Sequence, residues 1–213
     1  MLIGMFDSPF VRRVAVSLQL LGLPFEHANW SVGRDFDRIR RYNPLGRVPT
    51  LVCDDGESLL ESGAILDYLD QIVGPERALL ALAGRERRTA LRLMALASGA
   101  ADKTVAQVYE RAFRPEDKRH EPWLERCRTQ VDGTLAELDR WCARAEASPW
   151  LLGARLSQAD VTVACAFTFI SDALALTMPS AAYPALSAAA ASCEAMPEFQ
   201  ATRLALSPPR VSA

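Results

Sequence analysis

Three short segments in the first third of the 213-residue chain carry side chains whose types and spacing are suited to chemistry. They are residues 8–10, 43–49 and 60–63, with the sequences SPF, NPLGRVP and LESG. They place hydroxyl, carboxylate and guanidinium groups beside predicted helix and strand starts, and the chain has no glycine-rich nucleotide-binding pattern. If the neighbouring strands pair, the three segments meet at one place, where they can bind a small polar ligand and stabilise an anion.

Ser8 lies where a short apolar run meets a helical pattern. A serine at that junction is an ordinary N-cap, and Pro9 suits the first helical position. The start of a helix also presents free N–H groups and a partial positive charge, which favour a nearby anion. A ligand thiolate is such an anion, and a hydroxyl aimed at it would help to favour the thiolate by roughly 1 to 3 kcal/mol.

Val48-Pro49 precedes a predicted strand, where proline needs a reason because it cannot donate a hydrogen bond to the sheet. A cis bond between these two residues would turn the N–H and C=O groups of Val48 outward. An extended peptide could then pair with them like an added strand. The spacing by itself leaves the cis and trans forms equally open.

Glu61-Ser62 opens another helical pattern, and Ser62 can be a plain helix cap. An exposed helix start with a hydroxyl group is also a site for a carboxylate. The adjacent Glu61 can hold an ammonium group. A carboxylate site beside an ammonium site matches the amino-acid end of a peptide.

The segment 1–75 alternates strand and helix signals. Gly22 ends the first helix as a C-cap, and the turn sequence DDGE at 54–57 predicts an antiparallel hairpin. Apolar periodicity predicts helices over 10–21, 34–42 and 62–72, and strands over 2–6, 25–30, 48–53 and 58–60. The order is βαβ, then α, then ββα, which predicts a small α/β domain.

From residue 84 onward the pattern is helical. Ser157 and Asp160 predict a capping box, in which the Ser157 hydroxyl accepts from the N–H three residues on and the Asp160 carboxylate accepts from the Ser157 N–H. The helix behind them is apolar almost all round and should form the centre of this half. Helices are predicted over 84–114, 122–147, 161–178, 182–193 and 198–205.

These patterns predict two domains: an α/β domain over 1–75 and an all-helical domain over 84–206. Residues 76–83 are the predicted linker, and 207–213 a loose tail. Half of the residues are apolar and 23% are charged, as in ordinary globular proteins. The net charge of −2 provides no basic field for nucleic acid or anionic lipid.

Cysteine and histidine usage argues against disulfides and metals. The five cysteines are scattered, which favours free thiols in a reducing compartment, and the two histidines have no metal-ligand spacing. The start of the chain is not a signal peptide, and the longest apolar stretch, 161–170, is too short for a bilayer. We therefore predict a soluble cytoplasmic protein with no metal and no nucleic-acid or membrane partner.

Four motifs give the chain a resemblance to the cytosolic glutathione transferases. They are SPFVRRV at 8–14, NPLGRVPTL at 43–51, ESGAILDYL at 61–69 and LSQADVTVA at 156–164, in the family's order and spacing over nearly the whole chain. The first motif is most similar to a bacterial, serine-type group. The resemblance implies a thioredoxin-like N-terminal domain, an all-α C-terminal domain, a homodimer and a cis bond before Pro49.

The resemblance also implies roles for single residues, with glutathione as co-substrate and no tightly bound cofactor. Ser8 becomes the predicted catalytic residue, facing the glutathione sulfur. Predicted glutathione contacts are Phe10, Arg47, Val48, Pro49, Glu61 and Ser62. The candidates for a second-substrate pocket, which would hold a small electrophile, are Phe10, Tyr109, Phe113 and Trp123. Aromatic residues at helical spacing are also common in cores, and Asp160 is assigned to folding.

Serine at position 8 stands where some related branches carry cysteine, and a hydroxyl cannot form a mixed disulfide with glutathione. No tyrosine lies near the first strand, so the tyrosine-type classes do not fit. The predicted activity is attack of the glutathione thiolate on an electrophilic carbon, with detoxification as the implied setting. A glutathione-dependent peroxidase or lyase, and a non-catalytic binding or regulatory protein, are the alternatives.

Overall fold

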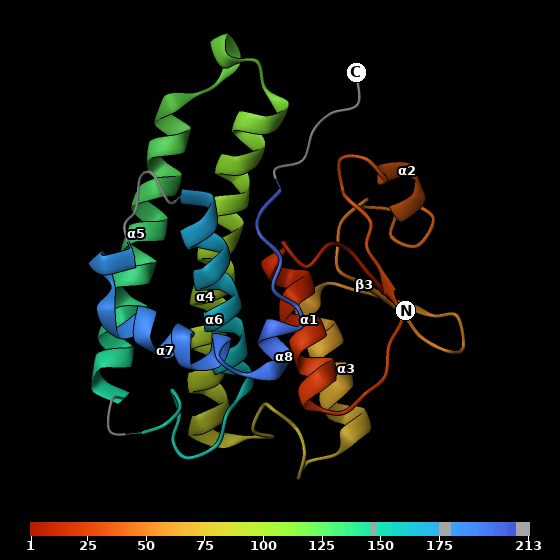
Figure 1. The fold of residues 1–213 in the computed structure, drawn as a ribbon, viewed down its shortest axis with the longest axis vertical. Coiled ribbons are helices and arrows are strands. Elements are labelled where there is room, and N and C mark those ends of the chain that lie inside the picture. The colour runs from red at the N-terminus through yellow and green to blue at the C-terminus, as the bar shows by residue number, and fades with distance from the viewer. Residues whose placement is uncertain (146–147, 175–179, 208–213) are drawn as a thin grey trace.

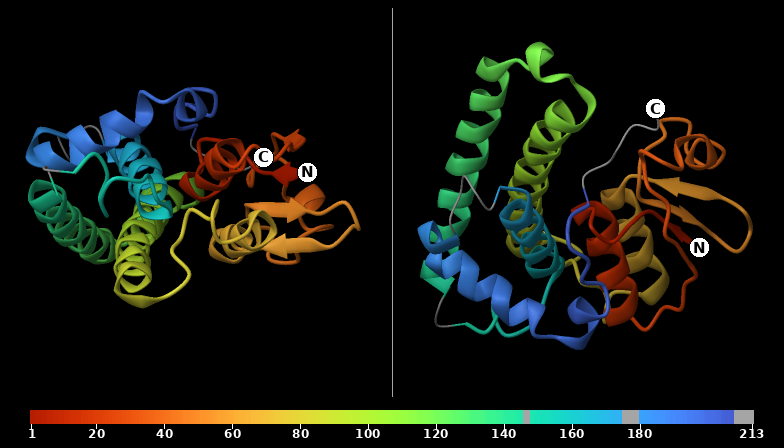
Figure 2. Two further views of the ribbon diagram at one scale, coloured as in Figure 1. Left: turned by 90° about the horizontal axis from the view of Figure 1, so that it is seen from below. Right: turned by 45° about the horizontal axis from the view of Figure 1, so that its top comes forward.

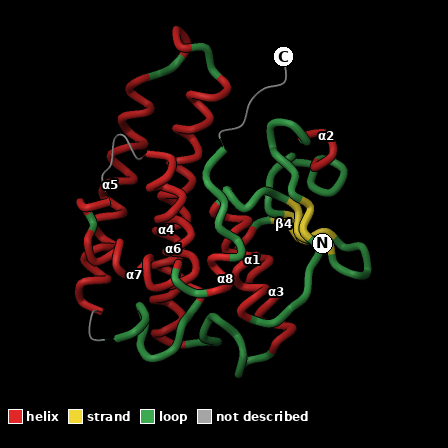
Figure 3. Tube along the Cα trace, viewed as in Figure 1, coloured by secondary structure: helices red, strands yellow, loops and turns green. Residues whose placement is uncertain are grey.

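The computed structural model describes residues 1–145, 148–174 and 180–207. It has a small α/β part beside a larger helical part, with the strands confined to the first part (Figures 1 and 3). Buried apolar side chains from both parts form one continuous core. The predicted fold class, a thioredoxin-like N-terminal domain and an all-α C-terminal domain, is confirmed.

The sheet has four short strands in the order β2-β1-β3-β4. β1 runs parallel to β2 and antiparallel to β3, and β3 is antiparallel to β4. Leu51 pairs with Leu59 in the predicted hairpin, which lies at the edge far from the helical part (Figure 2). The strand bounds are Leu2–Ile3 (β1), His27–Ala28 (β2), Thr50–Val52 (β3) and Ser58–Leu60 (β4).

Three of the strand predictions were too long. The predicted strand 2–6 ends at Ile3, because Gly4 has φ of 130° and leaves the extended region. The predicted strands 25–30 and 48–53 shrink to β2 and β3. An apolar run indicates that a segment is buried, but a strand also needs a hydrogen-bonded neighbouring strand along its length.

Three helices belong to the α/β part: α1 (Pro9–Leu20), α2 (Phe36–Ile39) and α3 (Ser62–Val73). Ser8 is the N-cap of α1, and its hydroxyl accepts a 3.4 Å hydrogen bond from the Val11 N–H. α1 packs against α3 and against the helical part, so most of its residues are buried. α2 is a single turn rather than the predicted helix over 34–42, because only Ile39 of its residues is buried.

The helical part is built on a long pair, α4 (Gly84–Phe113) and α5 (Glu121–Ala145), which run side by side (Figure 1). α6 (Gln158–Leu174) packs against α4, α7 and α1 and is buried along nearly its whole length, as predicted for the central helix. The described residues include no helix long and apolar enough to cross a membrane. The remaining elements are η1 (Glu116–Lys118), η2 (Ser180–Ala182), α7 (Pro184–Glu194) and α8 (Pro197–Gln200).

The predicted helix over 198–205 was wrong in length. α8 has four residues, and the Thr202 hydroxyl donates to the carbonyl oxygens of Glu198 and Phe199 at its end. The predicted ends of two other helices, at 146–147 and 175–178, lie outside the described residues, as does the predicted tail from 208 onward. α3 ends at Val73 and α4 begins at Gly84. The limits of the two domains stay a prediction.

Asp160 organises the start of α6, as predicted, although one of its two predicted bonds differs. Its carboxylate accepts from the Ser157 N–H at 2.9 Å and from the Leu151 N–H at 2.8 Å. The Ser157 hydroxyl donates to the same carboxylate at 2.7 Å, instead of accepting from the N–H three residues on. Asp160 is buried, and all three of its partners lie at the helix start or in the loop before it.

We expect Asp160→Ala to lower the free energy of unfolding by about 3 kcal/mol, because two backbone N–H groups and one hydroxyl lose their acceptor in a buried setting. Urea denaturation measures the change. Asp132→Ala, at an exposed position of α5, is the matched control and should change stability by about 0.5 kcal/mol or less. Equal effects of the two substitutions would contradict the role given to Asp160.

Candidate functional site

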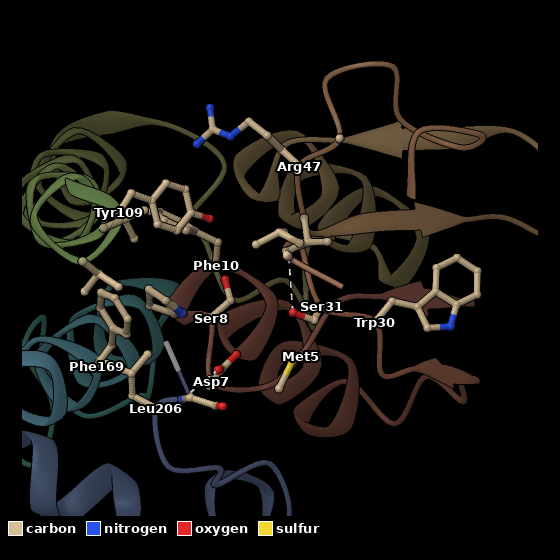
Figure 4. A pocket seen from close by; sticks show the side chains of 18 of the residues that line it. Met5, Asp7, Ser8, Phe10, Trp30, Ser31, Arg47, Tyr109, Phe169 and Leu206 are labelled. Carbon is tan, nitrogen blue, oxygen red and sulfur yellow. Dashed lines mark hydrogen bonds between the residues drawn. The ribbon is translucent and has the colours of Figure 1, made fainter. Parts of the chain in front are cut away.

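A cavity of about 710 Å³ lies between the two parts of the fold, at the start of α1 (Figure 4). From the α/β part it is lined by Ser8, Phe10, Arg47 and Val48, and from α4 by Tyr109 and Phe113. Residues that are far apart in the sequence therefore line the same cavity. The cavity is also lined by Asp7, Trp30, Ser31, Asp102, Val105, Phe169, Leu206 and Ser207.

Ser8 lines the cavity with its hydroxyl at the N-terminus of α1. Pro9 has no N–H, so the first main-chain donors of the helix are the N–H groups of Phe10 and Val11, and that of Val11 is bonded to the Ser8 hydroxyl. The Ser8 hydroxyl accepts only a long bond from Val11. Its own proton can therefore be donated to an anion in the cavity.

Val48 lines the same cavity, and the Val48–Pro49 peptide bond is cis, as the resemblance implied. Among the described residues, no hydrogen bond to the N–H or C=O group of Val48 is observed. A donor and an acceptor of the main chain are thus open beside the cavity, and an extended peptide can pair with both.

Gly4 lets this part of the chain come close to α1. A Cβ atom at Gly4 would lie 2.5 Å from Val11 Cγ2 and 2.8 Å from Val48 Cβ. With φ of 130°, the residue has a conformation that side chains rarely adopt. Val48 and the first turn of α1 therefore pack directly against the backbone of Gly4, which has no side chain.

Glu61 and Ser62 lie at the start of α3, outside the residues that line the cavity. Glu61 has φ of 69°, and its carboxylate accepts from the Gly63 N–H at 2.9 Å. Ser62 is buried, and its hydroxyl donates to Glu61 Oε1 at 3.1 Å. The two side chains thus form a hydrogen-bonded unit in which the Glu61 carboxylate stays exposed.

Arg13 supports this unit, although it was not among the residues predicted to form the site. Its Nη2 donates to the Ser62 hydroxyl at 2.6 Å and lies 3.9 Å from Glu61 Oε1, and its Nη1 donates to Ser98 of α4 at 3.0 Å. Burial lowers the pKa of Arg13, and the negative charge of Glu61 opposes that shift. Two adjacent arginines in a helical segment rich in apolar residues were the available signal, because a charged side chain in a buried helix needs a partner.

Of the four residues predicted to line the second-substrate pocket, three line the cavity and one does not. Phe10, Tyr109 and Phe113 line the cavity, and the rings of Tyr109 and Phe113 meet edge to face with centroids 4.9 Å apart. Trp123 does not line it: its ring lies on α5 with the Lys103 ammonium 5.2 Å from the centroid. Helical periodicity could not distinguish these positions, because it does not show which neighbour each face meets.

Arg47 and Asp102 face each other across the domain boundary. Arg47 Nη2 lies 3.7 Å from Asp102 Oδ1, and both side chains are more than half exposed. Burial raises the pKa of Asp102, and the charge of Arg47 opposes that shift. Both residues line the cavity, and the pair is too exposed to contribute much to stability.

Several residues that line the cavity were not predicted from the sequence. Asp7 lies beside Ser8, and its carboxylate accepts from the Ser207 N–H at 3.1 Å. Leu206 and Ser207 line the cavity although they belong to the last described residues. A contact between residues 200 positions apart leaves no local signal in the sequence. In the described residues, no group of three or more His, Cys, Asp or Glu side chains is placed to hold a metal ion.

The fold and the cavity define a two-domain protein with a thioredoxin-like half. Two family models match the chain: "Glutathione S-transferase, N-terminal domain" over residues 2–77 and "Glutathione S-transferase, C-terminal domain" over 121–189. A glutathione transferase family member from Pseudomonas fluorescens, solved with bound glutathione, is 32% identical with a TM-score of 0.78, covering 95% of this chain and 97% of that one. The chain belongs to the glutathione S-transferase family.

Two further proteins give the range of similarity. A glutathione S-transferase from Methylobacterium radiotolerans, solved in complex with glutathione sulfonate, has a TM-score of 0.86 and 29% identity, covering 100% of this chain and 95% of that one. The GST-like protein YibF of Escherichia coli, which is uncharacterized, is 29% identical over 170 residues, 80% of this chain and 81% of that protein. The serine-type subgroup stays a prediction.

We expect Gly4→Ala to destabilise the fold by about 3 kcal/mol, because the new methyl group would overlap Val11 and Val48 and the backbone would be strained. Gly133→Ala on α5 is the matched control. Its Cβ meets nothing within 4 Å, so alanine should raise helix stability by about 0.5 to 1 kcal/mol. Thermal denaturation of both variants tests the pair, and a neutral Gly4→Ala would contradict the close packing of Val48.

Proposed function

We propose that this protein is a glutathione transferase that joins the glutathione thiolate to a small electrophilic substrate. The observation that carries the proposal is the meeting of two features at one cavity. The Ser8 hydroxyl lies at a helix N-terminus, and the main-chain groups of Val48 are open beside it. The hydroxyl at the helix N-terminus suits a thiolate, and the main-chain groups of Val48 suit an extended peptide. Together they match a thiol-bearing tripeptide.

The proposed binding mode follows from these groups. The cysteinyl unit pairs with the Val48 backbone, and the γ-glutamyl end lies against Glu61 and Ser62. The Ser62 hydroxyl is occupied by Arg13 and Glu61, so the carboxylate of the ligand would meet N–H groups at the start of α3. Arg47 is the proposed contact of the glycyl carboxylate, with Phe10 and Pro49 as flanking contacts.

In the proposed reaction, the Ser8 hydroxyl donates a hydrogen bond to the glutathione sulfur and favours its thiolate form. The thiol proton passes to solvent. The thiolate attacks an electrophilic carbon held near Phe10, Tyr109 and Phe113, so that a C–S bond forms while the leaving group departs with its electron pair. The protein supplies proximity and thiolate stabilisation, without a covalent intermediate. Glutathione is the proposed co-substrate, and no tightly bound cofactor takes part.

The family further supports a homodimer, a cytoplasmic location and a role in detoxification, which stay predictions of the resemblance. The test of the function itself is calorimetric titration with glutathione, followed by turnover of activated haloarenes. Binding with turnover supports the proposal. Binding without conjugation, but with peroxide reduction or carbon–sulfur bond cleavage, would replace it by a peroxidase or lyase. Binding without any reaction would favour a regulatory protein, and absence of binding would overturn the proposal.

We expect Ser8→Ala to reduce turnover at neutral pH about tenfold to a hundredfold, because the thiolate loses a hydrogen bond that keeps the pKa of the thiol low. The loss of the N-cap should cost about 1 kcal/mol of stability and leave the fold intact. Ser8→Thr, which keeps the hydroxyl, is the control. The pH dependence of thiolate absorbance in bound glutathione measures the effect. Unchanged turnover in Ser8→Ala would remove Ser8 from the mechanism.

We expect Arg13→Lys to weaken glutathione binding about tenfold while kcat changes less, because an ammonium cannot reach Ser62 and Ser98 together as the guanidinium does. Calorimetry and initial rates separate the two effects. Arg88→Lys, at an exposed position of α4, is the matched control and should bind as the wild type does. Wild-type affinity in Arg13→Lys would show that Arg13 does not position the start of α3 for the ligand.

A further inference from the structure

Asp7 places a carboxylate beside the position proposed for the reacting sulfur. It directly precedes Ser8, lines the same cavity, and in Figure 4 lies next to Ser8 and Leu206, with Arg47 on the far side. Its Oδ2 accepts from the Ser207 N–H at 3.1 Å, which holds the carboxylate against the last described residue of the chain. The proposed mechanism gives Asp7 no role.

The charges around the cavity leave Asp7 without a cationic partner among the described residues. The charged lining residues are Asp7, Asp102 and Arg47. Arg47 already lies 3.7 Å from Asp102, and the proposed function assigns it to a carboxylate of glutathione. Asp7 forms no salt bridge with any described residue within 4.0 Å.

The rest of the wall on the helical side is apolar or aromatic. Val105, Tyr109 and Phe113 of α4 face the cavity, together with Phe169 of α6 and Leu206. Burial raises the pKa of Asp7, whereas backbone N–H groups of Ser207, Ser8 and Asp7 itself oppose that shift by stabilising the carboxylate. A carboxylate in poorly hydrated surroundings acts on nearby charges more strongly than one in water does.

We propose that Asp7 is a specificity-determining residue, which makes the electrophile pocket discriminate against anionic substrates and favour neutral, apolar aryl or alkyl electrophiles. The inference rests on the proposed function, because it concerns the second substrate of the same site. An anion bound beside Asp7 meets a like charge, finds Arg47 already paired, and loses hydration against apolar side chains. A neutral aromatic ring meets none of these costs and gains contacts with Phe10 and Tyr109.

The test compares two activated haloarenes of equal shape, 4-chloro-3-nitrobenzamide and 4-chloro-3-nitrobenzoate, which differ in charge. We expect the wild type to prefer the amide in kcat/KM, relative to the uncatalysed reaction of each, by roughly tenfold. Asp7→Asn keeps the acceptor for the Ser207 N–H and removes the charge, so it should lower that preference to about twofold or less. An effect of Asp7 on the glutathione thiolate is common to both substrates and cancels in the ratio.

Binding of the two S-aryl glutathione conjugates, measured by calorimetry, provides a readout that does not depend on turnover. The wild type should bind the amide conjugate more tightly, and Asp7→Asn should remove the difference. Asp132→Asn, which makes the same charge change at an exposed position outside the cavity, is the control and should leave the preference as it is.

The outcomes separate the two proposals. If the wild type shows no preference between the amide and the benzoate in kcat/KM, or if the preference is unchanged in Asp7→Asn, the role of Asp7 is overturned while conjugation of glutathione stands. Binding of the conjugates with the expected preference, but without turnover of either haloarene, supports the role of Asp7 and contradicts the transferase activity. A wild type that binds neither conjugate and turns over neither haloarene overturns both.

Discussion

Two consecutive arginines, Arg12 and Arg13, are buried in α1, and the hydrogen bonds of their guanidinium groups are the constraint on which the arrangement of the two domains depends. Arg12 donates to both carboxylate oxygens of Glu194 at 2.6 Å and to the carbonyl oxygen of Phe199 at 3.0 Å. The Thr168 hydroxyl donates to the same carboxylate at 2.6 Å. Burial is the largest single effect and lowers the pKa of Arg12, but the bond to Glu194 and the negative charges around it, those of Glu194 and Asp172 among them, together raise it.

The two arginines point in different directions and therefore fix α1 on two sides. Arg12 binds Glu194 of α7 and so connects α1 to the helical domain. Arg13 binds Ser62 at the start of α3 and Ser98 in the middle of α4. Removing one partner of a buried pair typically costs about 3 to 5 kcal/mol, because the other charge is left without compensation. α1 thus has little freedom to rotate or slide, and its N-terminus stays at the cavity.

The cavity divides its chemistry between the two domains. The α/β side contributes polar groups that are set by local structure: the cap hydroxyl of Ser8, the main chain of Val48 and the carboxylate of Asp7. The helical side contributes mainly apolar and aromatic surface from α4 and α6, and α4 adds the carboxylate of Asp102. Such a division lets the polar side recognise one ligand by hydrogen bonds, while the apolar side accepts partners by shape and hydrophobic contact.

The sequence by itself determined the local features of this protein. Ser8 as a cap, the β3–β4 hairpin, the bond from Ser157 to Asp160 and the buried character of α6 follow from residue types within a few positions, because caps, turns and periodicity are short-range. Only the tertiary structure decided which residues meet over long separations. The burial of Arg12 and Arg13, the contact of Asp7 with Ser207 and the placement of Trp123 away from the cavity depend on how whole helices pack, and no local pattern encodes that.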